Sequence, residues 1–321
     1  MQSIRRVSRI AITCAFACIS SAHAQTAFPL KPLRFVAMST GFPENTARAL
    51  ANEMTLMAKQ NIVVDPRPGA NGILAAEHVA RATPDGYTLL VGTNSTHAAN
   101  PSLYKKLPYD YVKDFAPVSG ISLGMSALVV NPHVPAKSVG ELTALARKSP
   151  GKLTFGHGSS VSLTAVEYYK LLTGVSIVAV PYKTVPQGVT DLIAGRIDIM
   201  TANLGAAVPQ VQAKRLRALA VTGGTRWPLL PDTPTLHEAG VANYEWTFWN
   251  AAWLPANTPP EIVTRMSEWI NTALERPRVK DYLFNAGSVA FGTTPDGLMK
   301  FQMTEHDKWR KVIVAAKISA E

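Results

Sequence analysis

A histidine and three serines stand close together in the stretch HGSSVS, which runs from His157 to Ser162. Side chains of these types can perform nucleophilic chemistry. A hydrolase with a nucleophile elbow would need the pattern G-x-S-x-G, and the second glycine is missing here. No aspartate or glutamate stands nearby to orient the histidine as a base. A secreted serine hydrolase using Ser159 or Ser160 is therefore kept only as a remote alternative.

Anion binding is the interpretation that we favour for the same stretch. It lies between an apolar run and a helical pattern, so it forms the turn that opens a helix. Backbone N–H groups at a helix start have no partner within the helix, and together with serine hydroxyls they hold negative groups. A flexible helix start without a ligand is the plainer alternative.

A second turn of this kind lies in the stretch RFVAMSTGFPENTARAL, residues 34–50. A phosphate loop of the Walker type would need a Gly-Lys pair, and a dinucleotide loop would need repeated glycines, but Gly41 stands alone. The turn therefore predicts free N–H groups facing an anion that is not a nucleotide. Glu44 suits the positive end of the helix dipole; contact with a polar or amine group of a ligand is its alternative.

The remaining chemistry-bearing residues predict neither a metal site nor a cofactor. The seven histidines show no H-x-x-x-H or H-E-x-x-H spacing. Both cysteines, Cys14 and Cys18, fall in the first 24 residues. We therefore expect no catalytic set, no disulfide and no enzyme.

The first residues have the features of a secretory signal peptide. Arginines at the start precede the apolar stretch Ile10 to Ile19, and an A-x-A pattern ends at Ala24. We expect cleavage there and export to the periplasm. The net charge of +10, spread over scattered lysines and arginines, suits the attraction of small anions and not nucleic-acid binding.

Apolar runs alternate with helical patterns along most of the chain, which predicts an α/β fold with parallel sheets. The expected strands are 33–38, 61–65, 87–91, 127–130, 153–156, 177–180, 197–201 and 216–221. The expected helices begin near residues 47, 73, 138, 162, 187, 206, 259 and 294. Parallel sheets bind ligands beyond the carboxyl ends of their strands, and two facing sheets make a cleft. The aromatic residues from Tyr244 to Trp253 are expected to pack in a half-buried strand, or else to line a ligand.

Several motifs in order resemble the periplasmic receptors of tripartite tricarboxylate transporters, also called the Bug family. They cover nearly the whole chain after residue 24: RPGANG (67–72), PDGYTLL (84–90), LPYD (107–110), DFAPV (114–118), VPYK (180–183), LRALAVT (216–222), PDTPT (231–235) and EAG (238–240). The resemblance implies a two-lobed periplasmic binding protein of type II, the "Venus flytrap", in which each lobe is a mainly parallel sheet flanked by helices. Two crossover strands would join lobe 1 (25–125 plus 251–321) to lobe 2 (126–250).

The resemblance further implies that a small organic anion is held between the two turns and passed to a membrane transporter. A receptor that reports to a sensor protein is the alternative, and a monomer is the usual state. The predicted ligand-binding residues come from the two turns and from neighbouring strand ends: Ser39, Thr40, Gly41, Phe42, Thr93, Asn94, His157, Gly158, Ser159, Ser160, Val161, Ser162, Ala202 and Asn203.

The chain departs from the family pattern in the expected pocket. Thr40 and Glu44 replace a glycine and an aspartate of the first turn, Ala202 replaces an aspartate, and Thr184 replaces the glycine after VPYK. Losing the aspartate at 202 removes an acceptor for an amine. We therefore expect the ligand to be a dicarboxylate or an aromatic carboxylate rather than an amino acid.

Overall fold

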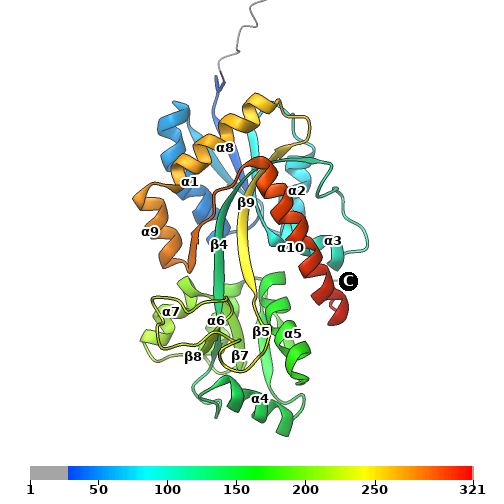
Figure 1. The fold of residues 1–321 in the computed structure, drawn as a ribbon, viewed down its shortest axis with the longest axis vertical. Coiled ribbons are helices and arrows are strands. Elements are labelled where there is room, and N and C mark those ends of the chain that lie inside the picture. Colours follow the sequence, from blue (N-terminus) through cyan, green and yellow to red (C-terminus); the bar gives the residue numbers. More distant parts are fainter. Residues whose placement is uncertain (1–27, 320–321) are drawn as a thin grey trace, which may run out of the picture.

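The computed structural model describes residues 28–319 as two lobes, one above the other in Figure 1. The predicted signal peptide and both cysteines lie outside this range. The strands are β1 (Leu33–Ala37), β2 (Ile62–Pro66), β3 (Thr88–Thr93), β4 (Phe115–Val130), β5 (Thr154–His157), β6 (Val178–Pro181), β7 (Ile199–Asn203), β8 (Arg217–Val221), β9 (Thr247–Pro255) and β10 (Ser288–Ala290).

Helices flank the strands in both lobes (Figure 1). They are α1 (Phe42–Ala58), α2 (Ile73–Ala80), α3 (Asn100–Leu103), α4 (Val139–Lys148), α5 (Ser160–Thr173), α6 (Val185–Ile193), α7 (Leu204–Gln212), α8 (Pro260–Leu274), α9 (Pro277–Asn285) and α10 (Pro295–Ala315). The short helical turns η1 (Ala70–Gly72) and η2 (Ser95–Ala99) follow β2 and β3.

The long strand β4 ties the two lobes together. The strand order is β2-β1-β3-β9-β4-β7-β5-β6, with β10 and β8 also paired to β4. Strands β1, β2 and β3 are parallel, as are β5, β6 and β7, whereas β9 runs antiparallel to β3 and β4. The predicted two-lobed α/β class is confirmed.

Backbone pairing shows where the chain passes between the lobes. Strand β4 pairs with β9 up to Met125 and with β7 from Ser126 onward. Strand β9 pairs with the first sheet from Thr247, a little before the expected return at 251. The exact lobe limits stay a prediction, and this pairing favours a second crossing just before Thr247.

The expected helix at residues 47–58 forms because its apolar side chains recur on one face. In α1 the buried positions include Ala47, Leu50, Ala51 and Met54, the spacing of an amphipathic helix. They pack on Phe35 and Ala37 of β1 and on the inner face of α8. This packing fixes the direction of α1, and the N-terminal end of the helix faces the second lobe (Figure 1).

Three features differ from the sequence-based expectation. The strand expected at 127–130 is the end of the much longer β4, and α9 was not expected. The aromatic residues are buried more deeply than a half-buried strand allows, and two of the tryptophans find hydrogen-bond partners inside. Trp249 Nε1 donates to Glu305 Oε2 and Trp253 Nε1 to Gln302 Oε1, both at 3.0 Å, so two amphipathic rings are satisfied in the core.

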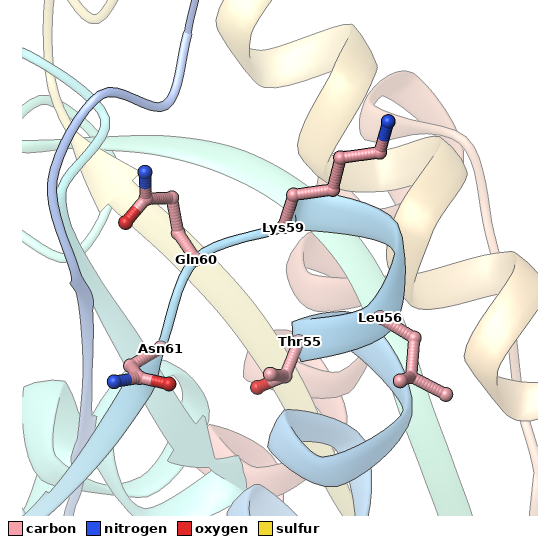
Figure 2. Close-up of a pocket in the computed structure, with 5 residues that line it drawn as sticks. All are labelled: Thr55, Leu56, Lys59, Gln60 and Asn61. Atoms are coloured by element: carbon pink, nitrogen blue, oxygen red, sulfur yellow. The ribbon is translucent and has the colours of Figure 1, made fainter.

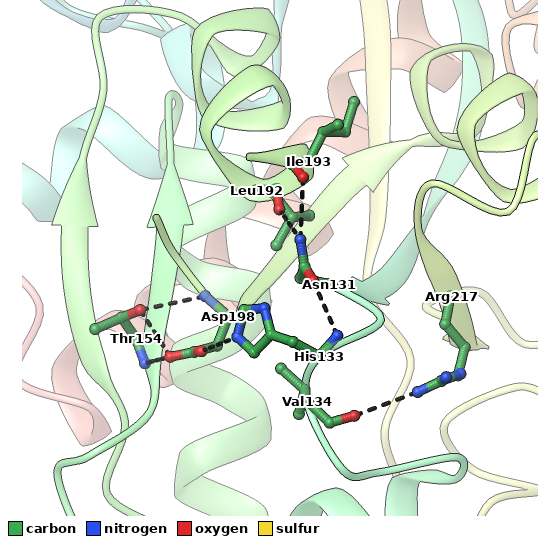
Figure 3. Close-up of polar contacts among 8 residues, drawn as sticks. All are labelled: Asn131, His133, Val134, Thr154, Leu192, Ile193, Asp198 and Arg217. Carbon is green, nitrogen blue, oxygen red and sulfur yellow. Dashed lines mark hydrogen bonds and ion pairs between the residues drawn. The ribbon is translucent and has the colours of Figure 1, made fainter. Parts of the chain in front are cut away.

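A polar network closes the end of the second sheet (Figure 3). Asp198 Oδ2 accepts hydrogen bonds from the N–H and hydroxyl of Thr154, at 2.8 and 2.9 Å, while its Oδ1 lies 3.0 Å from His133 Nε2. Asn131 Nδ2 donates to the carbonyls of Leu192 and Ile193. The network fixes the start of β5 and β7, so the opposite ends of these strands are held for a site.

Candidate ligand-binding site

A cleft of about 720 Å³ lies between the lobes, where the carboxyl ends of β1, β3, β5, β6 and β7 are followed by helix starts. A volume of several hundred Å³ suits a small-molecule ligand. The other hollow, of about 410 Å³, lies at the far end of α1 and is lined by five residues from Thr55 to Asn61 (Figure 2). It is built from one helix end and its following turn, so the interlobe cleft is the candidate site.

The structure brings most of the predicted site residues together in this cleft. Eleven of the fourteen line it: Ser39, Thr40, Gly41, Phe42, Thr93, Asn94, Gly158, Ser159, Val161, Ser162 and Asn203. Three do not. Ala202 is 1% exposed and faces the interior, His157 precedes the turn, and Ser160 points to a neighbouring serine instead.

The first turn offers unpaired backbone donors. Gly41 has a φ of 82°, a left-handed value that favours glycine, and it ends the turn just before α1. Among residues 28–319, the N–H groups of Ser39, Thr40 and Gly41 find no protein acceptor. Glu44 does not line the cleft, since it is ion-paired with Arg48 at 2.7 Å. The turn thus has donors without a nearby carboxylate.

The second turn is largely satisfied by its own side chains. Ser159 caps α5 by accepting from the N–H of Ser162, and the Ser162 hydroxyl accepts from the N–H groups of Gly158 and Ser159. This is a capping box. The N–H groups of Ser160 and Val161 remain without an acceptor in the described part of the chain.

Replacing Ser159 by alanine tests whether this residue caps α5. We expect Ser159→Ala to lower the free energy of unfolding by about 1 kcal/mol, because a helix N-cap is lost. Ser138→Ala is the matched control: Ser138 caps α4 with a bond of the same 3.2 Å to the N–H of Glu141. Urea denaturation should give similar losses for both variants, and an unchanged value for Ser159→Ala alone would contradict the capping geometry.

Two further helices start at the cleft. Thr184 caps α6 and Asn203 caps α7, and residues after each cap line the cleft. With α1 and α5, four helix N-termini meet there, and each carries a partial positive charge. The sequence placed Asn203 among the predicted ligand-binding residues and Thr184 only among the changes in the expected pocket, because the position of α6 beside α1 and α5 depends on the fold.

Asn94 contributes a buried donor. Its side chain is 0% exposed and lines the cleft, and its Oδ1 accepts from the N–H of Trp249 at 3.4 Å. Its Nδ2 has no hydrogen-bond partner in the described part of the chain. An unsatisfied buried donor costs free energy, so this group is suited to an acceptor on a bound molecule.

The charge of the cleft is positive. Lys183 is the only charged side chain among the described residues that line it. Burial lowers the pKa of His157, next to the second turn, so this imidazole is mainly neutral at pH 7. The field at the site therefore comes from helix starts and one lysine, an arrangement for an anion.

Comparison with known proteins places these features in a family. The model described as "Tripartite tricarboxylate transporter family receptor" matches residues 46–318. The chain belongs to this receptor family. The expected resemblance is thereby confirmed, and so is its description as a family of solute-binding proteins with the two-lobed periplasmic fold.

Individual relatives of this receptor are similar over most of their length. The UPF0065 protein in the tcbD-tcbE intergenic region of Pseudomonas sp. (strain P51) is 33% identical, covering 94% of this chain and 91% of the relative. Protein BugT of Bordetella pertussis is 30% identical over 98% of both chains.

Two solved structures of Rhodopseudomonas palustris proteins are also similar. Rpa4515 with adipate shares 34% identity with a TM-score of 0.86, covering 91% of this chain and 99% of that one. MatC with bound malate shares 28% with a TM-score of 0.81, covering 89% and 100%.

The serines of the second turn lack a catalytic partner in the described residues. Ser160 Oγ lies 2.7 Å from Ser95 Oγ, and Ser159 Oγ lies 3.2 Å from Ser162 Oγ. The hydrogen bond between His133 and Asp198 lies at the opposite end of β7 (Figure 3). Among the described residues, neither serine hydroxyl is hydrogen-bonded to a histidine or a carboxylate.

Among residues 28–319, no cluster of three metal-ligating side chains occurs. In the same range, no helix is both long and apolar enough to span a membrane.

Proposed function

We propose that this receptor captures a small organic carboxylate in the interlobe cleft and delivers it to a membrane transporter. The observation that carries the proposal is the convergence of four helix N-termini on a cleft whose described lining has no acidic side chain. A carboxylate would replace the missing acceptor of Asn94 and of the free N–H groups at Ser39 to Gly41. The adipate and malate named for the two similar structures support the same ligand chemistry.

The lining also narrows the class of carboxylate. A bound amino acid needs an acceptor for its ammonium group, and the described cleft residues provide no carboxylate for it. A dicarboxylate or an aromatic carboxylate fits better. Lys183 would attract either acid from solution, since it has no ion-pair partner in the described part of the chain.

Binding without turnover is part of the proposal. The hydroxyls of Ser159 and Ser160 are engaged with other serines, so they are placed to shape the turn and not to attack a substrate. The receptor would work in the periplasm as a monomer, after cleavage behind Ala24. Its partners would be the membrane subunits of the transporter.

A thermal-shift screen of the mature protein tests the function. We expect carboxylates to raise the unfolding midpoint, because a ligand at 100 times its Kd adds about 2.7 kcal/mol of stability. Each acid is paired with its uncharged amide, which has the same shape without the charge. An amide that stabilises as strongly as its acid would count against an anion site. Recovery of the ligand unchanged by mass spectrometry separates binding from turnover, and ester hydrolysis abolished by Ser160→Ala would favour the hydrolase.

A further inference from the structure

Three aromatic rings form a corner at one end of the cleft. They come from distant segments: Phe42 begins α1, Phe248 lies in β9 and Tyr282 lies in α9. The Phe42 and Phe248 centroids are 5.4 Å apart with planes at 79°, and those of Phe42 and Tyr282 are 6.2 Å apart with planes at 19°. All three residues line the cleft. These are the edge-to-face and stacked arrangements that aromatic rings prefer.

The corner is held in place by its surroundings. Phe248 is 7% exposed and lies against Gly124, where an added Cβ would approach the Phe248 ring to 2.5 Å. The Tyr282 hydroxyl donates to the carbonyl of Phe42 at 3.4 Å. Burial raises the pKa of Tyr282, so this hydroxyl stays a donor at neutral pH. The rings are therefore pre-organised and need little rearrangement on binding.

Small residues let the start of α7 approach the end of α9 closely at this end of the cleft. Gly205 and Ala206, at the start of α7, line it from lobe 2, and Ala286 lines it just after α9. A Cβ added at Gly205 would lie 3.1 Å from Ala286 Cα, which places these segments side by side. Lobe 2 thus contributes no bulky side chain here.

The corner also adjoins the predicted anion site. Phe42 directly follows the turn of Ser39 to Gly41, which carries the free N–H groups. Residues 39–42 all line the cleft, so a carboxylate held at this turn would share the cleft with the Phe42 ring. Lys183, which could hold a second carboxylate, follows the edge strand β6, two strands from β7 and its Asn203. Strands lie about 4.8 Å apart, so the aromatic end is separated from the lysine.

We propose that the ligand is an arenecarboxylate, whose flat ring packs in the corner of Phe42, Phe248 and Tyr282 while its carboxylate meets the first turn. This inference rests on the proposed function and names its ligand class. An aromatic ligand ring should bind more tightly than a saturated one, because it can stack on one ring of the corner and meet another edge-to-face. The aromatic corner would favour aromatic acids over other carboxylates, and the helix N-termini would favour a negatively charged ligand.

Isothermal titration calorimetry with matched acids tests the inference. Benzoate and phenylacetate are compared with cyclohexanecarboxylate and hexanoate, which carry similar apolar volume without an aromatic ring. We expect the aromatic acids to bind about threefold to tenfold more tightly. In Phe42→Leu this preference should disappear, so that the aromatic and the saturated acids bind with affinities within about twofold of each other. Thermal unfolding without ligand checks that each variant folds.

Phe284→Leu is the matched control. Phe284 lies in the same helix as Tyr282, but it packs on Trp227 and does not line the cleft. It should leave all four affinities unchanged. If hexanoate binds as tightly as benzoate and Phe42→Leu loses both equally, the arenecarboxylate inference is wrong while carboxylate binding stands. If benzamide binds as tightly as benzoate, the carboxylate function itself fails.

Discussion

Replacing Asn94 by aspartate is expected to weaken carboxylate binding by roughly a hundredfold or more. The substitution keeps the size of the side chain and the oxygen that accepts from the N–H of Trp249. It converts the unpartnered, buried Nδ2 of a residue that lines the cleft into a carboxylate oxygen. Two negative charges about 4 Å apart repel by about 4 kcal/mol at an effective dielectric near 20, and each 1.4 kcal/mol is a factor of ten in affinity.

Two companion variants separate charge from the loss of a hydrogen bond. Asn94→Ala removes the donor without adding charge, and it should cost roughly tenfold, the value of one hydrogen bond to a charged group. Asn61→Asp adds the same charge at the opposite end of α1, beside the hollow of Figure 2, and should change affinity less than twofold. Calorimetry on all three is the measurement. Tight binding by Asn94→Asp would place the carboxylate elsewhere.

Local pattern was sufficient to predict most of the fold. The strands at 33–37 and 154–157 are short apolar runs between turn residues, and α1 repeats its apolar residues at helical spacing. These features depend on neighbours in the chain. Strand β4 was predicted only in its last part, because its first half contains serines and glycines that pack closely against β9 and the segment after β10. Nothing in the local sequence shows that contact.

The candidate site also has features that the local sequence predicts and features that only the fold creates. Both turns could be predicted because each is a strand end followed by a helix start. The aromatic corner could not, since Phe42 and Tyr282 are separated by 240 positions in the chain and meet only when α9 packs beside α1. Ser160 stays a predicted ligand-binding residue, although it is not among the residues that line the cleft. Its position in a serine-rich turn was correct, but its hydroxyl direction depends on Ser95 of the other lobe.

The stability of the protein is expected to fall as the pH drops below about 6.5, and His97 is the main cause. His97 is 0% exposed, with its ring stacked on Trp253 at a centroid distance of 3.7 Å, and its Nε2 has no hydrogen-bond partner in the described part of the chain. Burial lowers the pKa of His97 well below its usual value. Below about pH 6.5, the unfolded chain therefore takes up a proton that the folded protein does not. The free energy of unfolding then decreases with falling pH, by up to about 1.4 kcal/mol per pH unit for this histidine.

Urea denaturation between pH 8 and pH 5 measures this dependence, and His97→Phe isolates it. The variant keeps an aromatic ring against Trp253 and removes the proton-binding group, so above pH 7.5 its stability should stay within about 1.5 kcal/mol of the wild type. Below pH 6.5, the free energy of unfolding of the variant should fall less steeply with decreasing pH, because one fewer proton is taken up on unfolding. His78 and His157, whose pKa values burial also lowers, account for the slope that remains. Equal slopes for His97→Phe and the wild type would mean that the buried imidazole is protonated without unfolding, which its apolar surroundings oppose.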